Sequence, residues 1–269
     1  MIDIHCHILP NVPGDDGSPD LEETVRMFEL ARADGIDTII CTPHGKQPAG
    51  DQIKRMDEIR AATEEKAAEY GIRLLRGLEY NLPQLFQVDE NGVGLAGTSF
   101  MLIDFVRSRM DSSVDAISRS THSAGFHPIC AHPERLFQSW EHVRHIYNTG
   151  YTMQLTAASI LGDFGRMCQK FSLSLLDHGL CHYVASDAHS TSRAFRQTEC
   201  RKFVADTYGE ETANILFDEN PKRLLANQMP LEIPVVSDDY DDELPKNPFL
   251  RSLYRFFLGH RRDEEDDED

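Results

Sequence analysis

Short apolar runs rich in β-branched residues alternate with longer segments of helical period along most of this chain. Such runs are typical of strands buried in a parallel sheet, and the segments between them have the composition of covering helices. The alternation predicts an α/β fold and not a sandwich, and we expect a distorted TIM-like (β/α)7 barrel. The expected strands are Ile2–Ile4, Thr38–Cys41, Ile72–Leu75, Phe100–Phe105, Pro128–Ala131, Tyr151–Leu155 and Tyr183–Ala185. The expected helices are Pro19–Asp34, Asp51–Tyr70, Ser113–Ala124, Ser139–Asn148, Gly165–His178 and Ser192–Tyr208.

The first expected helix carries signals at both of its ends. Ser18 precedes Pro19, which matches an N-cap followed by proline at the first helical position. Gly35 follows the segment, and a glycine at that place commonly ends a helix. We therefore expect Ser18 to cap this helix and Gly35 to terminate it.

The length of the chain, 269 residues, suffices for one large hydrophobic core, and α/β barrels of about this size are routinely single domains. We expect one main domain. The first residues lack a basic segment followed by a long apolar stretch, and no run approaches the roughly 18 apolar residues of a membrane span. We expect a soluble, cytoplasmic protein.

The formal net charge of −18 disfavours nucleic acid as a partner, because proteins that bind a phosphate backbone carry basic patches. It does not exclude a phosphorylated substrate, since bound divalent cations reverse the sign of the field inside a site. The six cysteines are dispersed and form no C-x-x-C pair, which indicates reduced, structural thiols. A cysteine-dependent phosphatase would need the spacing C-x5-R, whereas Cys130 and Arg135 have the spacing C-x4-R.

Residues 230–269 differ in composition from the preceding chain, and we expect an acidic appendage to a main domain of residues 1–229. Removing the seven acidic residues at the end would change the formal charge from −18 to −11. The segment Phe249–Arg262 combines apolar residues at helical spacing with arginines, which suits a partner or a membrane surface. The alternative is a helix that docks on the barrel.

Histidines and carboxylates recur where the expected strands end. His5 and His7 share one face of a strand, while Cys6 faces the other way. The ends of parallel strands in a barrel meet at one rim, where active sites of this architecture lie. A lone histidine is more often structural, but repetition at six strand ends predicts a metal site, and imidazole and carboxylate ligands suit manganese, iron or zinc. The strand-end candidates are His5, His7, His44, Glu79, Asp104, His132, Asp187 and His189.

Two arginines follow strand ends that carry these candidates. Arg135 and Arg193 could each donate two hydrogen bonds to the oxygens of a phosphate and offset its charge. The alternative for each is a surface arginine that pairs with one of the many carboxylates. The remaining histidines of the main domain are interpreted as structural: His122, His127, His142, His145, His178 and His182.

Taken together, these motifs resemble the polymerase-and-histidinol-phosphatase (PHP) family, and most closely its bacterial branch of manganese-dependent protein-tyrosine phosphatases of capsule and exopolysaccharide synthesis. The resemblance covers about residues 1–228 and implies the PHP type of barrel. Its motifs are Met1–Pro10 leading to Asp15-Asp16-Gly17-Ser18, Thr42-Pro43-His44, Gly77-Leu78-Glu79, Ala131-His132-Pro133-Glu134-Arg135, Ala185-Ser186-Asp187-Ala188-His189 and Glu219-Asn220-Pro221.

The resemblance implies a cluster of three metal ions, manganese with iron or zinc as alternatives, and Arg135 and Arg193 as phosphate contacts. Two departures from the family's pattern bear on the cluster. Family members commonly have a glutamate where Asp104 stands, and the loop before Asp15 is longer than usual, so Asp15 could replace Asp16 as a ligand. The implied ligands are His5, His7, Asp16, His44, Glu79, Asp104, His132, Asp187 and His189.

The implied substrate is phosphotyrosine on the tail of a bacterial tyrosine kinase, hydrolysed by metal-activated hydroxide. The same cluster would serve a small phosphomonoester such as histidinol phosphate, and this is the second hypothesis. The third is a catalytically silent metal-binding or docking protein, suggested by Asp104 and the acidic tail. Membrane association would come only through a membrane-bound partner or through Phe249–Arg262. The oligomeric state does not follow from the sequence.

Overall fold

The computed structural model describes residues 1–45, 49–81, 92–105, 114–135 and 140–236. Residues 1–236 form one compact unit of parallel strands and covering helices, so the predicted α/β class is confirmed. The strands are β1 (Ile2–Cys6), β2 (Thr38–Cys41), β3 (His44–Gly45), β4 (Arg73–Arg76), β5 (Glu79–Asn81), β6 (Phe100–Asp104), β7 (His127–Ala131), β8 (Thr152–Thr156) and β9 (Tyr183–Ala185).

All seven expected strands are present, within one or two residues of their expected bounds. Two of them are followed by a second short strand, because β2 breaks at Thr42-Pro43 before β3, and β4 breaks at Gly77-Leu78 before β5. The strands therefore form two parallel sheets, β1-β2-β4 and β3-β5-β6-β7-β8-β9. The expected (β/α)7 barrel is therefore distorted at these two breaks, and the described strands do not close into one continuous sheet.

Single hydrogen bonds bring the end of β1 to the segment that follows β9. The amide of Asp187 donates to the carbonyl of His5 at 2.9 Å, and the amide of His7 donates to the carbonyl of Ala188 at 2.8 Å. On its other side, the carbonyl of Cys6 accepts from the amide of Thr42, just after β2, at 2.9 Å. The carboxyl ends of β1, β2 and β9 therefore meet, although the sheets are separate.

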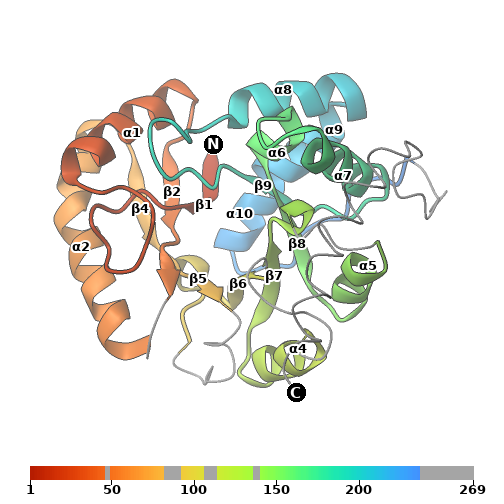
Figure 1. The fold of residues 1–269 in the computed structure, drawn as a ribbon, viewed down its shortest axis with the longest axis horizontal. Coiled ribbons are helices and arrows are strands. Elements are labelled where there is room, and N and C mark those ends of the chain that lie inside the picture. The colour runs from red at the N-terminus through yellow and green to blue at the C-terminus, as the bar shows by residue number, and fades with distance from the viewer. Residues whose placement is uncertain (46–48, 82–91, 106–113, 136–139, 237–269) are drawn as a thin grey trace, which may run out of the picture. The chain divides into compact units, whose positions relative to one another are not determined.

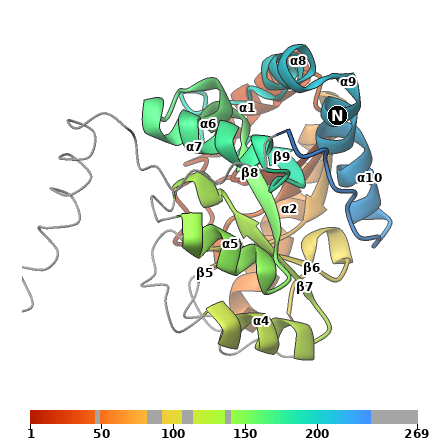
Figure 2. The same cartoon turned by 90° about the vertical axis from the view of Figure 1, so that its right-hand side faces the viewer.

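Helices surround the strands (Figures 1 and 2). In Figure 1, α1 and α2 lie outside β2 and β4, whereas α4 and α5 lie beside β7 and β8. The helices are α1 (Leu21–Ala33), α2 (Ala49–Glu69), α4 (Val114–Ser123), α5 (Trp140–Asn148), α6 (Ala157–Leu161), α7 (Arg166–Asp177), α8 (Gln197–Tyr208), α9 (Glu210–Asn214) and α10 (Asn220–Leu225). Shorter turns are η1 (Leu95–Gly97), η2 (Pro133–Arg135) and the π-helical η3 (Ile215–Glu219).

The core divides into two clusters, because alternate residues of a strand point to opposite faces. In β6, Met101 and Ile103 belong to a large cluster that also takes in residues of the covering helices, such as Phe28 of α1. Phe100 and Leu102 belong to a smaller cluster on the other face. Both faces of the strands are thus buried, as parallel sheets require.

The first helix begins later than expected, and the predicted cap is wrong. Asp20, not Ser18, is the N-cap of α1, and its carboxylate accepts from the amide of Glu23 at 2.8 Å. The hydroxyl of Ser18 instead donates to the carbonyl of Asp20 and lies 2.8 Å from the hydroxyl of Thr24. The predicted end is confirmed, since Gly35 has φ +77° and donates to the carbonyl of Arg32. Similarly, α8 begins at Gln197 and not at Ser192.

The chain beyond α10 packs back onto the main unit up to Val236. The side chain of Asn220 accepts from the amide of Leu231 and donates to its carbonyl, and the amide of Val236 donates to the carbonyl of Asp177 at 2.8 Å. The predicted segment Phe249–Arg262 and the rest of 237–269 lie outside the described residues. Among the helices described, none has the length and apolar character needed to cross a membrane.

Candidate metal centre

Every one of the nine residues predicted as metal ligands lies in one cluster at the carboxyl ends of the strands. Four overlapping groups of possible ligand atoms include all nine residues. Within each group, the atoms lie within 4.8 Å of one another. The groups are His7, Asp16, His44 and His189; His5, His132 and Asp187; His5, His7 and Glu79; and Glu79, Asp104 and His132. The polar ends of separate segments thus converge, as the parallel arrangement predicts.

Two histidines from the end of β1 direct their Nε2 atoms into the cluster. His5 and His7 are fully buried and their Nε2 atoms lie 3.2 Å apart, while Cys6 between them belongs to the large core cluster. The Nδ1 of His5 lies 2.8 Å from Oε1 of Gln154 in β8, and the Nδ1 of His7 lies 2.8 Å from Oδ1 of Asp15. A hydrogen bond of this kind places the proton on Nδ1, so the lone pair of Nε2 is free to coordinate a metal ion.

Glu79 of β5 lies at the centre of the cluster and is fully buried. Its Oε1 is 2.9 Å from Nε2 of His132 and 3.3 Å from Nε2 of His5. Its Oε2 is 2.6 Å from Nδ1 of His44 and 3.4 Å from Nε2 of His7. One carboxylate therefore contacts four imidazoles, which is the arrangement of a group that can bridge two cations.

The loop after β1 supplies two aspartates with different positions. Asp16 places Oδ1 3.1 Å from Nε2 of His44 and 3.5 Å from Nε2 of His189. Asp15 is not in the donor groups, because its Oδ1 accepts from the backbone amide of His44 at 2.9 Å as well as contacting His7. Gly17 permits this arrangement, since a Cβ there would lie 2.2 Å from the carbonyl oxygen of His7. The geometry thus puts Asp16 in the cluster and Asp15 behind it.

Asp187 joins the cluster to the two predicted arginines. Its Oδ1 lies 3.3 Å from Nε2 of His5, and its Oδ2 pairs with a terminal nitrogen of Arg135 at 2.5 Å and with Arg193. Asp187 has φ +51°, a conformation uncommon outside glycine and found at functional sites. Arg135 also donates to Oγ1 of Thr156, at the end of β8, at 2.9 Å. Both arginines are therefore held at the cluster, not paired elsewhere on the surface.

The aspartate that stands where a glutamate is usual also reaches the cluster. Asp104 is 3% exposed at the end of β6, and one of its oxygens lies within 4.8 Å of the donor atoms of Glu79 and His132. His132 follows β7 directly and has φ +34°, so the chain turns sharply there to bring the imidazole to Glu79. The shorter carboxylate is thus still close enough to share a cation with Glu79.

The electrostatics of the cluster depend on burial and on its opposed charges. Burial disfavours a charged His7, but the carboxylates of Asp15 and Glu79 outweigh this and raise its pKa to about 10. Burial and the neighbouring His7 lower the pKa of His189 to about 3. Burial opposes ionisation of Asp187, yet His5 and Arg135 hold its pKa well below the usual range. The buried carboxylates thus attract positive charge, carried either by protons on imidazoles or by bound cations.

A second layer of hydrogen bonds supports the turn that carries Asp187. Asp3 of β1 is fully buried; its Oδ1 accepts from the amide of Ser186 at 3.0 Å and from the side-chain amide of Gln197 at 2.8 Å. The hydroxyl of Ser186 donates to the other oxygen at 2.5 Å. Burial raises the pKa of Asp3 to about 6 despite these hydrogen bonds. Neither Asp3 nor Gln154 was predicted, because neither follows a strand end as the strand-end candidates do.

The cysteines and the other described histidines take no part in the cluster. All six thiols are free and buried, and burial raises the pKa of Cys41 to about 12 and that of Cys168 to about 11. Cys130 lies inside β7 with its pKa also raised well above the usual value by burial, so a thiolate nucleophile is disfavoured there. Histidines such as His182, which accepts from the amide of Met153, belong to the scaffold.

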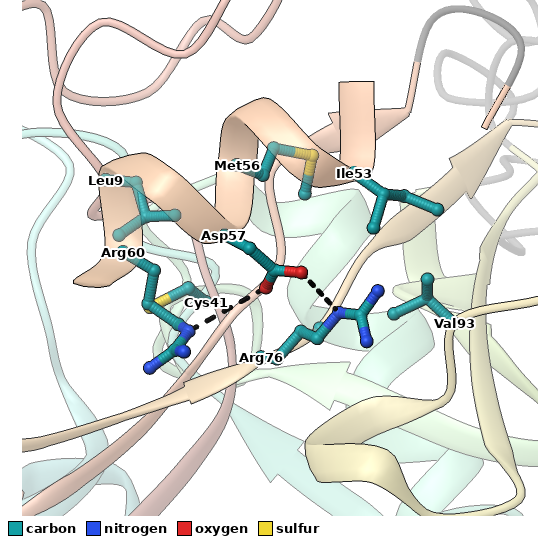
Figure 3. Close-up of a pocket in the computed structure, with 9 residues that line it drawn as sticks. Leu9, Cys41, Ile53, Met56, Asp57, Arg60, Arg76 and Val93 are labelled. Atoms are coloured by element: carbon teal, nitrogen blue, oxygen red, sulfur yellow. Dashed lines mark ion pairs between the residues drawn. The ribbon is translucent and has the colours of Figure 1, made fainter. Parts of the chain in front are cut away.

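A pocket beside α2 shares no residue with the donor groups (Figure 3). Its charges pair with each other: the carboxylate of Asp57 lies 3.3 Å from Nε of Arg76 and 4.0 Å from Nε of Arg60. The remaining lining is largely apolar and consists of Leu9, Cys41, Ile53, Met56, Gly77 and Val93. The pocket therefore lacks the combination of imidazole and carboxylate groups that makes up the cluster.

The donor set fits divalent metal ions. Among the described residues, Nδ1 of His132 is buried without a hydrogen-bond partner, while Oε2 of Glu79 and Nδ1 of His44, also buried, lie 2.6 Å from each other without hydrogen-bond geometry. Unpaired buried donors and acceptors cost free energy unless a ligand satisfies them. Imidazole nitrogens mixed with carboxylate oxygens, without thiolate, match manganese, iron or zinc. The cluster is thus able to bind metal ions.

Comparisons with known proteins agree with this geometry. Residues 1–226 match the family described as capsular polysaccharide synthesis, CpsB/CapC. The tyrosine-protein phosphatase YwqE of Bacillus subtilis is 32% identical over 269 residues, covering 96% of this chain and 100% of that protein. The putative tyrosine-protein phosphatase CapC of Staphylococcus aureus is 32% identical over 243 residues, covering 85% of this chain and 92% of that one.

A solved structure shows the same relationship in three dimensions. It comes from a study of YwqE from Bacillus subtilis and CpsB from Streptococcus pneumoniae, described there as unique metal-dependent tyrosine phosphatases. It aligns with a TM-score of 0.75 and 31% sequence identity, over 87% of this chain and 98% of that one. The similarity therefore spans the whole unit that carries the cluster.

Proposed function

The chain belongs to the capsular polysaccharide synthesis family CpsB/CapC, and we propose on that basis that it is a metal-dependent protein-tyrosine phosphatase. The observation that carries the proposal is Asp187, whose two oxygens face the histidine cluster on one side and two guanidinium groups on the other. Metal donors and phosphate-binding cations adjoin at that carboxylate, which suits phosphoryl transfer to water. The substrate is a phosphotyrosine protein.

The nine clustered donors would hold the metal ions, which we propose to be three manganese ions, with iron or zinc as alternatives. When bound, such ions lower the pKa of a water molecule and take up charge on the phosphoryl group. Glu79, which contacts four imidazoles, would be shared between ions, and Asp104 would contribute beside it. Gln154 and Asp15 would keep His5 and His7 oriented.

Arg135 and Arg193 would hold the phosphate. Their Nε atoms are buried and find no hydrogen-bond acceptor within the described part of the chain, so each guanidinium retains a donor for a phosphoryl oxygen. Thr156 and Asp187 fix Arg135 in place, which lowers the entropy lost on binding. Tyrosine is a good leaving group, because the pKa of its phenol is about 10 and little protonation is needed.

The proposal includes the partner and the location. The phosphotyrosine would lie on the tail of a bacterial tyrosine kinase of capsule synthesis, and the reaction would take place in the cytoplasm. The match to a capsular polysaccharide synthesis family supports this partner. A phosphorylated kinase-tail peptide and cell fractionation would test these two points separately.

The deciding experiment measures turnover and metal content on the same protein. Protein stripped by a chelator is reloaded with manganese, iron or zinc and assayed with a phosphotyrosine peptide and with histidinol phosphate. We expect metal-restored turnover that favours the peptide, and about three metal equivalents. Asp187→Asn should lose most of the turnover, whereas Asp177→Asn, a change of the same kind at the end of α7, should retain it. Preference for histidinol phosphate would rule out a phosphotyrosine protein as the substrate. Bound metal without any turnover would rule out the proposed catalytic activity.

A further inference from the structure

Phe164 is an exposed aromatic residue at the metal centre to which the proposed reaction assigns no task. Its side chain is 38% exposed, and among the exposed large apolar residues of the described chain it alone is aromatic. It lies in the turn between α6 and α7 (Figure 1), distant in sequence from the strand ends that supply the donors. Its position relative to the arginines makes it more than an isolated exposed side chain.

The ring of Phe164 lies against both guanidinium groups. Its centroid is 4.4 Å from the Cζ of Arg135 and 5.4 Å from the Cζ of Arg193. Distances below about 6 Å are those of cation–π contacts. The same two groups pair with Asp187, so the ring stands immediately beside the place where the phosphate would be held.

The turn that presents Phe164 is held on both sides. Gly162 and Gly165 have φ +96° and +92°, which a residue with a side chain rarely adopts, and the amide of Gly165 donates to the carbonyl of Gly162 at 3.0 Å. Asp163 pairs with Arg196 at 2.5 Å, just before α8. Because the backbone is fixed, the ring keeps its position without a large loss of entropy when a ligand arrives.

We propose that Phe164 is a specificity-determining residue that packs against the aromatic ring of the phosphorylated tyrosine; this rests on the proposed phosphatase function. In an aryl phosphate a single oxygen joins phosphorus to the ring, so a phosphate held by Arg135 and Arg193 brings that ring next to the aromatic side chain beside them. Offset or edge-on aromatic pairs are favourable, and an alkyl phosphate offers no such surface. The residue therefore selects phosphotyrosine over phosphothreonine.

The test compares Phe164→Ala with the wild-type protein reloaded with metal. Three quantities are measured: KM for a phosphotyrosine peptide, and the inhibition constants of inorganic phosphate and of the phosphothreonine peptide of the same sequence. We expect KM to rise about tenfold, with both inhibition constants within about twofold of wild type. Phe164→Tyr should restore KM, and Phe164→Leu should restore only part of it. Leu30→Ala is the matched control, because Leu30 is equally exposed at 38% but lies on α1.

The alternative role for Phe164 is to support the arginines. In that case Phe164→Ala would weaken all three ligands by the same factor, and this result would overturn the inference. An unchanged KM of Phe164→Ala would also overturn the inference. If the wild type still turned over the phosphotyrosine peptide, the proposed phosphatase function would not be affected by that result. A wild-type protein without phosphotyrosine turnover would reject both. Circular dichroism of each variant separates these outcomes from loss of folding.

Discussion

At the scale of single residues, the histidines of the cluster depend on partners that bind no metal themselves. Oε1 of Gln154 lies 2.8 Å from Nδ1 of His5, and Oδ1 of Asp15 lies 2.8 Å from Nδ1 of His7. Such partners set which nitrogen carries the proton and how the ring is aimed, so their loss weakens metal binding without removing a ligand. Gln154 is fully buried, which makes it the sharper test.

Gln154→Leu should lower metal affinity by about 10- to 100-fold while the protein stays folded, because His5 loses the acceptor that orients it. Isothermal titration of the chelator-treated protein with manganese measures the affinity, and circular dichroism checks the fold. Gln169→Leu is a suitable control, since Gln169 hydrogen-bonds to the carbonyl of Ile160 outside the cluster. Equal affinities for Gln154→Leu and wild type would contradict the assigned role.

The sequence predicts the residues that form the cluster better than those that support it. His5, His44 and Asp187 follow the ends of strands that the sequence predicts, and the parallel arrangement alone brings such positions together. Gln154 lies within a strand and Phe164 in a turn, so the strand-end pattern does not identify them. The choice between Asp15 and Asp16 also needed coordinates, because neighbouring residues of a loop can point either way.

At the scale of elements, the apolar runs predict strands well, but interruptions and caps depend on tertiary contacts. Gly77, between β4 and β5, illustrates the difference. A Cβ on Gly77 would lie 2.7 Å from Cγ2 of Ile40 and 3.0 Å from the carbonyl oxygen of Cys41. The sequence shows only a glycine after an apolar run, whereas the structure shows that β2 and β4 can approach only because no side chain is there.

Gly77→Ala should lower the free energy of unfolding by about 1–3 kcal/mol, the usual cost of overpacking a core. It should also weaken metal binding, because Glu79 follows two residues later on β5. Urea denaturation and metal titration measure the two effects. Gly125→Ala provides a contrast: no atom lies within 4 Å of its added Cβ, but φ is +86°, so we expect roughly 1 kcal/mol of strain and unchanged metal affinity. Unaltered stability of Gly77→Ala would exclude the steric account.

Asp34 and Asp37 near the end of α1 should show opposite dependence of stability on pH. Asp34 accepts from the amides of Gln197 and Thr198 at the start of α8, yet burial raises its pKa. Burial also acts on Asp37, but the hydrogen bond from Thr38 and the terminal amino group outweigh it and lower its pKa. A raised carboxyl pKa gives stability that is present at low pH and lost as the pH rises; a lowered one gives stability lost as the pH falls.

The pair Asp34→Asn and Asp37→Asn measures these signs. As the pH rises from about 4 to 7, Asp34→Asn should gain stability relative to wild type. As the pH falls below about 4, the wild type should lose the stability that ionised Asp37 gives, so Asp37→Asn should gain relative to wild type in that range. Urea denaturation of chelator-treated protein at several pH values gives both differences without interference from metal binding. The same direction of pH dependence in both variants would show that the local environments do not control these two carboxyls.

At the scale of the whole molecule, residues 1–236 form one compact unit that includes every donor of the cluster. A chain that ends at Val236 should therefore keep metal-dependent turnover, with a thermal midpoint close to that of the full chain. The hydrogen bond of Val236 to Asp177 and the bonds between Asn220 and Leu231 favour this end point. Truncation after Asn227 removes these contacts and should be less stable. Loss of turnover on ending at Val236 would give residues 237–269 a part in the reaction.

Metal ions should stabilise this unit, because its donors come from many separate segments and approach one another only in the folded chain. A single site filled at about 100 times its Kd contributes roughly 2.7 kcal/mol, and each kcal/mol raises the midpoint of a protein of this size by about 2–4 °C.

The stabilisation by metal ions should grow with pH. The raised pKa of His7, about 10, means that protons compete with cations for its imidazole, so binding releases protons and is favoured as the pH rises. Thermal melts with and without manganese at about pH 6 and pH 8 measure this, and a stabilisation that shrank toward higher pH would mean that His7 is not a ligand.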